Sequence, residues 1–197
     1  MELVCLGAGC RKKAILGPIA VNVYSAALFV EAGPAAKELG VRQRGGLFAD
    51  GRDAAYCDAL LDGAFMKALH LVLVRSVSGD TFAAALAEAL ELRLRLAGAA
   101  EALPLLVAAL TARGSFDKGV EVFFTWRPDG ALEVTVQPPA DGGAGGRLRG
   151  PRLRPDAVIP SQPLCRALFE VFLGADSVMP DGRAAFAAGA RHLLEAK

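Results

Sequence analysis

An arginine and a tyrosine near the start of the chain are the residues best suited to hold an anion. Arg11 lies in a cationic cluster with Lys12 and Lys13, and Tyr24 follows inside an otherwise apolar run. A guanidinium presents a planar fork that matches a carboxylate, and a phenol can donate a hydrogen bond to the same group. The two side chains form an anion site if they point inward. They are ordinary strand residues if they face water, and residue type alone leaves both alternatives open.

The histidines and cysteines carry no signature of a metal site. No pair of cysteines has CxxC spacing, and the chain has only two histidines, so we expect no zinc, no other metal and no cofactor. The four cysteines are expected to be reduced, buried small hydrophobes. Cys165 should be packed and unreactive, since no base is evident near it. We expect His70 to be a structural histidine within a strand and His192 to lie on the surface.

Composition bounds the class of protein. The chain has 197 residues, enough for one domain with a proper core, and 53% of them are hydrophobic. Lys and Arg number 22 against 21 Asp and Glu, a net charge of +1. This balance offers no basic surface for nucleic acid. No apolar run approaches the length of a membrane span, so we expect no membrane span.

The first third of the chain predicts short strands and then helices. We expect strands over residues 2–6, 10–16 and 19–31, the first ending at Gly7 and Gly9, in an antiparallel meander. Residues 34–64 have helical spacing around a glycine-rich loop. Residues 67–80 alternate as a strand.

The rest of the chain predicts a helical layer and one hairpin. A helix is expected to begin at residues 79–81 with Asp80 as its N-cap, followed by a second helix over 99–112. Residues 119–137 form a hairpin with a Pro128–Asp129–Gly130 turn. Residues 138–156 are low-complexity and are expected to form a mobile surface loop, before two final helices. Strands and helices in separate runs predict a single α+β domain over 1–197, with an antiparallel sheet.

Several of these segments together resemble the chalcone isomerase family. They are LGAGCRKKAILG, VYSAALFVE, LVLVRSVSGDTFAAALAEAL, KGVEVFFTW and PLCRALFEVFLGADSVMP. Within that family, the chain is most similar to the plastid chalcone-isomerase-like fatty-acid-binding proteins of plants and algae. The resemblance covers nearly the whole chain. It implies an open-faced β-sandwich, in which a large antiparallel sheet is backed by a helical layer with a ligand cleft between them.

The resemblance also bears on catalysis. Chalcone isomerases that close a flavanone ring use an arginine and a threonine on early strands, with a tyrosine and an asparagine on a helix. The arginine matches Arg11, but the other positions fall on Tyr24, Phe82 and Ala89. Phe82 and Ala89 have no side-chain donor, so the polar groups that such catalysis needs are missing. We therefore expect a non-catalytic binding protein. The alternative is an intramolecular lyase acting on a chalcone or another phenolic enone.

The fatty-acid-binding members hold their ligand's carboxylate with an arginine and a tyrosine at these two positions. The resemblance thus implies that Arg11 and Tyr24 hold the carboxylate of a medium- to long-chain fatty acid. The acyl chain would be lined by apolar side chains of the helix: Phe82, Leu86, Ala89 and Leu90.

The family also implies a role in fatty acid metabolism and a location in the chloroplast stroma. Because the sequence begins without a transit segment, the cytoplasm is the alternative. A third hypothesis is a helper that raises flux through another enzyme. The oligomeric state stays open.

Overall fold

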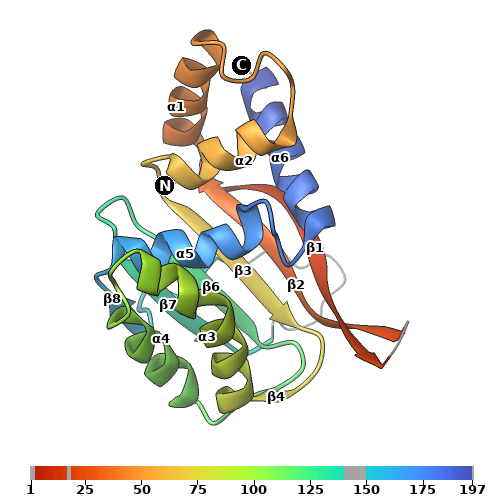
Figure 1. Ribbon diagram of the computed structural model, residues 1–197, viewed down its shortest axis with the longest axis vertical. Helices are drawn as coiled ribbons and strands as arrows, with labels where there is room; N and C mark the ends of the chain where they lie inside the picture. Colours follow the sequence, from red (N-terminus) through yellow and green to blue (C-terminus); the bar gives the residue numbers. More distant parts are fainter. Residues whose placement is uncertain (1–2, 17–18, 140–149, 197) are drawn as a thin grey trace.

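A computed structural model describes residues 3–16, 19–139 and 150–196, which form an α+β unit of strands and helices (Figure 1). The strands are β1 Leu3–Leu16, β2 Ile19–Glu31, β3 Lys67–Leu73, β4 Val77–Ser78, β5 Ser115–Phe116, β6 Glu121–Trp126, β7 Leu132–Gln137 and β8 Ala157–Ile159. The helices are α1 Ala32–Arg44, α2 Asp53–Asp62, α3 Gly79–Leu96, α4 Ala102–Thr111, α5 Gln162–Leu173 and α6 Pro180–Glu195.

The main sheet is wholly antiparallel, as the sequence predicted. Its strand order is β1-β2-β3-β6-β7-β8, and β4 and β5 form a separate small pair. The expected hairpin is β6–β7, closed by a turn in which Gly130 has a positive φ of 84°. That conformation suits glycine because it has no Cβ.

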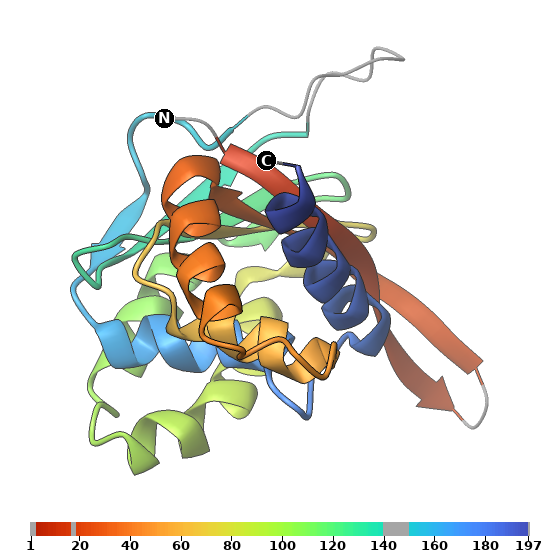
Figure 2. The ribbon, with the colours of Figure 1, turned by 90° about the horizontal axis from the view of Figure 1, so that it is seen from above.

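The helices cover one face of the main sheet (Figure 2). Trp126 of β6 packs against Phe169 of α5, with ring centroids 5.5 Å apart. Lys67 lies opposite Trp126 on β3, and its ammonium donates a hydrogen bond to the Leu60 carbonyl of α2. Because side chains alternate along a strand, the neighbouring Ala68 and His70 point to the opposite face. We call the face of Lys67 and Trp126 the helix-facing side of the sheet, and the face of Ala68 and His70 its outer face.

The N-terminal strands differ from the prediction. Residues 3–16 form one long strand, so Gly7 and Gly9 lie inside β1 and do not end it. The physical reason is the neighbouring helix α6. A Cβ on Gly7 would lie 2.8 Å from the Ala185 carbonyl oxygen, and one on Gly9 would lie 2.6 Å from the Gly182 Cα. These glycines permit close approach of strand and helix, a role that a turn-based interpretation misses.

The N-cap of α3 and the exposure of two cysteines also differ from the prediction. Ser78 is the N-cap of α3, since its hydroxyl accepts a hydrogen bond from the Thr81 amide at 3.1 Å, and Asp80 lies in the first turn. Ser78 has the extended backbone that an N-cap requires, whereas Asp80 is already helical. Cys5 and Cys10 are exposed, not buried.

The predicted loop over 138–156 is described only in part, because residues 140–149 lie outside the described residues. The end of this loop is hydrogen-bonded to strand β7 through Asp156. The Asp156 amide donates to the Val134 carbonyl at 2.8 Å, and the Val136 amide donates to Asp156 Oδ2 at 2.6 Å. This end of the loop therefore lies along the edge of β7 before β8 begins.

Candidate ligand-binding site

The structure brings Arg11 and Tyr24 together as cross-strand partners. Arg11 on β1 lies opposite Tyr24 on β2, and Tyr24 in turn lies opposite Leu73 on β3. Tyr24 is only 5% exposed, and its ring centroid lies 6.3 Å from that of Phe172 on α5. Tyr24 therefore points into the helix-facing core. Of the two alternatives that the sequence left open, the inward orientation holds for this residue.

The arginine is coupled electrostatically to the tyrosine. Burial raises the pKa of Tyr24, while the charge of Arg11 and a hydrogen bond with its side chain act in the opposite direction. The phenol thus keeps its proton near neutral pH and remains a hydrogen-bond donor. Among the described residues, Arg11 forms no salt bridge with a carboxylate. Its guanidinium is therefore free of a fixed anionic partner within this part of the chain.

The strands around the pair are irregular. The register of β1 against β2 shifts between Arg11 and Lys12, which marks a bulge or irregularity directly beside the arginine. Bulges redirect side chains and occur often beside functional sites. Pairing of β2 with β3 begins at Tyr24, so the β1–β2 ribbon continues beyond β3 as a two-stranded projection. The pair lies where this ribbon joins the main sheet.

The predicted lining residues of α3 belong to the same core. Phe82 and Leu86 are each 5% exposed, Leu90 is fully buried, and Ala89 is half-buried against the cluster that includes Tyr24. The Phe82 ring packs at 5.2 Å from that of Phe116 on β5. Three cavities in the described part of the chain are lined by other residues, and neither the Arg11–Tyr24 pair nor these α3 side chains belong to those linings. Tyr24 and the apolar side chains of α3 thus belong to one buried core, and Arg11 beside Tyr24 is partly buried.

Phe172 is a neighbour of the site that sequence reasoning missed. It is fully buried on α5 and contributes an aromatic wall beside Tyr24. The available signal was the strongly amphipathic segment from Gln162 to Leu173, which carries two phenylalanines on its buried face. That pattern predicts a core helix, but it does not say which strand residue each ring will meet.

A second polar group is buried on the outer face of the sheet. His70 Nε2 lies 3.1 Å from Glu121 Oε2, and Gln137 Nε2 donates to the same oxygen at 3.0 Å. The His70 ring stacks on Phe123 with centroids 4.1 Å apart. Burial lowers the pKa of His70, and Glu121 opposes the shift. His70 is thus buried and hydrogen-bonded, as expected of a structural histidine.

Lys67 is a buried charged residue that sequence reasoning missed. It is 1% exposed, and its Nζ donates to three carbonyl oxygens at the end of α2: Leu60 at 2.7 Å, Leu61 at 3.2 Å and Gly63 at 2.7 Å. The ammonium also lies 4.2 Å from the centre of the Trp126 ring. Burial lowers the pKa of Lys67 to about 7. The carbonyls favour its charged form and so oppose that shift.

Within the described residues, no group of three or more His, Cys, Asp or Glu side chains could hold a metal ion. The same part of the chain contains no helix with the length and apolar character needed to cross a membrane.

The architecture and topology define the chalcone isomerase-like fold. A solved structure of a fatty-acid-binding protein from Arabidopsis thaliana is similar to this chain with a TM-score of 0.80, over 98% of this chain and 90% of that chain, at 18% sequence identity. No family model and no curated protein matches the sequence. At this identity the likeness establishes the fold, and the function has to be argued from the site.

Proposed function

We propose that this protein binds a free fatty acid without catalysing a reaction, and that Arg11 and Tyr24 hold the carboxylate. The observation that carries the proposal is the pairing of an arginine without a fixed anionic partner in the described residues with a buried, protonated tyrosine. Such a pair can offer a carboxylate two charge-assisted hydrogen bonds. The similar Arabidopsis protein, which its description names as a fatty-acid-binding protein, supports the same class of ligand.

The acyl chain would lie between the sheet and helices α3 and α5. Phe82, Leu86 and Leu90 supply an apolar wall there, and Phe172 supplies another beside the tyrosine. Each buried methylene contributes about 0.8 kcal/mol, which favours a medium or long chain. Since these side chains pack closely, we expect ligand entry to require their displacement. By this proposal the protein would hold free acid in support of fatty acid metabolism.

The decisive experiment is a calorimetric titration with tetradecanoate. Arg11→Ala should cost about 2–5 kcal/mol of binding free energy, because the buried carboxylate loses its counter-charge, which corresponds to roughly 30- to several-thousand-fold in affinity. Arg11→Lys should recover only part of the loss, since an ammonium lacks the planar fork. Tyr24→Phe should cost about 1–2 kcal/mol, as one hydrogen bond to a charged group.

Two controls make the titration specific. The methyl ester of the same acid should bind the wild type weakly and lose little more with Arg11→Ala, because it has no charge to hold. Melting curves should show that each variant is folded. If folded Arg11→Ala binds the free acid as tightly as the wild type, the assigned site is wrong. Stereoselective cyclisation of a chalcone above the buffer rate would instead favour the intramolecular lyase.

A further inference from the structure

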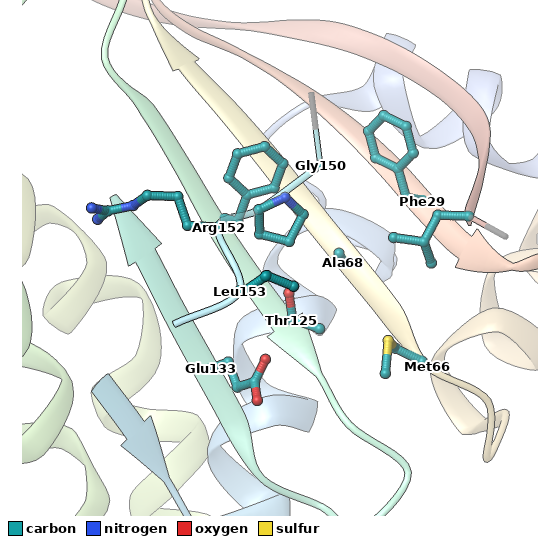
Figure 3. A pocket seen from close by; sticks show the side chains of 11 residues that line it. Phe29, Met66, Ala68, Thr125, Glu133, Gly150, Arg152 and Leu153 are labelled. Carbon is teal, nitrogen blue, oxygen red and sulfur yellow. The ribbon is translucent and has the colours of Figure 1, made fainter. Parts of the chain in front are cut away.

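The outer face of the main sheet contains a cavity that the proposed fatty-acid site does not use. Its volume is about 460 Å³, within the range of roughly 300–1,000 Å³ that small-molecule sites occupy. Its floor is a cross-strand row in which Phe29, Ala68, Thr125 and Glu133 lie side by side on β2, β3, β6 and β7. Residues 150–153 line it from the chain segment that precedes β8 (Figure 3).

This cavity is separated from the Arg11–Tyr24 pair by the sheet itself. Phe29 and Ala68 alternate along their strands with Leu28 and Leu69, which are fully buried on the helix-facing side. Tyr24 lies on the side of Leu28 and contacts Phe172 of α5. A ligand on the outer face would therefore contact neither the proposed carboxylate site nor the helical layer.

The charged side chains around the cavity are already paired. Glu133 Oε1 accepts a hydrogen bond from Arg127 at 3.1 Å. Arg152 Nη2 donates to the Val136 carbonyl at 2.5 Å and to Asp156 at 3.1 Å, and its guanidinium extends away from Phe29 and Ala68 in Figure 3. Among the described residues of the lining, a charged ligand would thus find no unpaired counter-ion, and its desolvation would be uncompensated there. The lining favours an uncharged ligand.

One polar group remains for such a ligand. Thr125 is 5% exposed, and its hydroxyl has no hydrogen-bond partner within the described residues. Around it, the lining is apolar, with rings from Phe29 and Phe123 and side chains from Met66 and Leu153. Leu153, which lines the same cavity as Thr125, is fully exposed, at 102%. A ligand against this leucine would bury apolar area that water now covers.

We infer that this cavity is a second binding site, which takes a small uncharged amphiphile with its polar end on the Thr125 hydroxyl. A medium-chain alcohol has this chemistry, with one group that can accept or donate a hydrogen bond and an apolar body for the phenylalanine rings. The site differs in ligand charge from the proposed fatty-acid site, and it does not depend on that function.

The test is a titration of the full chain with 1-octanol, followed residue by residue by amide chemical shifts. The amides of Ala68, Phe123 and Thr125 should shift together along one saturating curve. Thr125→Val keeps the shape of the side chain and removes the hydroxyl, so it should weaken that curve about three- to tenfold. Ala68→Phe fills the cavity floor and should abolish the shifts.

A matched control, Ala8→Phe, introduces a phenylalanine on the outer face of the sheet at a residue that does not line the cavity. Ala8 is exposed and is joined to Phe123 through the cross-strand row Ala8, Ala27, His70 and Phe123. Ala8→Phe should retain octanol binding at the outer face. The inference is overturned if the outer-face amides do not respond to octanol, or if folded Ala68→Phe or Thr125→Val binds there as the wild type does. Thr125→Val keeps the test valid even if Ala68→Phe is unstable.

Discussion

At Tyr24, burial and a neighbouring cation act on the same phenol in opposite directions. Burial disfavours the phenolate and raises the pKa, while Arg11 stabilises the phenolate by charge and by a hydrogen bond. This balance keeps the hydroxyl as a donor near neutral pH without removing the cation that an anionic ligand needs. The two residues therefore form one electrostatic unit, and a change in either should be measurable in the other.

We predict that Arg11→Ala raises the pKa of Tyr24 further, because the substitution removes both effects that lower it. The measurement is a pH titration of the tyrosine ring carbon resonances. The chain has only two tyrosines, so Tyr56 serves as the internal reference. A pKa of Tyr24 that does not move would show that the guanidinium is not coupled to the phenol in solution. This result needs no ligand, so it tests the geometry separately from the function.

At the scale of the element, a buried lysine completes the end of α2. The last carbonyls of a helix have no partners within the helix. Lys67 reaches from β3 and satisfies carbonyls of Leu60, Leu61 and Gly63 with its three ammonium hydrogens. The same interaction ties α2 to the sheet, so the capping residue comes from another element.

We predict that Lys67→Met destabilises the protein by at least about 1–3 kcal/mol, because it leaves buried carbonyl oxygens without donors. Urea unfolding of wild type and variant measures this difference. Lys37→Met is the matched control, since Lys37 is exposed on α1 and its loss should change stability little. Equal stability of Lys67→Met and Lys37→Met would contradict the capping role.

At the scale of the whole molecule, glycines allow helix α6 to pack closely against strand β1. Gly7 of the strand lies against Ala185 of the helix, and Gly9 lies against Gly182. Gly189 of the helix lies against Leu6, the residue before Gly7. A Cβ on Gly189 would overlap the carbonyl group of Leu6. This contact joins the C-terminal helix to the first strand, which also carries Arg11.

We predict that Gly189→Ala destabilises the fold by about 1–3 kcal/mol, because the added methyl forces the helix away from the strand. Melting curves and urea unfolding provide the measurement. Gly33→Ala is the control, since a Cβ there meets nothing within 4 Å and alanine favours a helix. If Gly189→Ala melts like the wild type, the close approach of α6 to β1 is not present in solution.

The buried histidine on the outer face should make overall stability depend on pH. Burial lowers the pKa of His70 below its ordinary value of 6.5, so the unfolded chain binds this proton more readily than the folded one. The free energy of unfolding should therefore fall as the pH drops through 6.5 towards the folded-state pKa. Above that window the effect is absent, because His70 is neutral in both states.

The check is urea unfolding between about pH 5 and 8 for wild type and for His70→Gln. Glutamine can still donate to Glu121, but it does not titrate, so its stability should fall less steeply on acidification. Identical slopes for the two proteins would mean that His70 does not carry this pH dependence.

Local pattern alone determined much of the architecture. The β6–β7 hairpin follows from its Pro128–Asp129–Gly130 turn, and the α3 and α5 helices follow from apolar spacing. The nearness of Arg11 and Tyr24 also has a local cause, since their two strands follow one another in the sequence and pair with each other. These features depend on residues close in sequence, which is why they could be predicted without the structure.

Contacts between distant segments decided the rest. Gly7 and Gly9 looked like strand ends because their actual partner, α6, lies far away along the chain. The partner of His70 on β6 is likewise set by packing between distant segments, as is the contact of Tyr24 with Phe172. The cavity on the outer face needs four strands and the segment before β8 in one place. No local sequence signal encodes such a juxtaposition, because it exists only after the sheet has assembled.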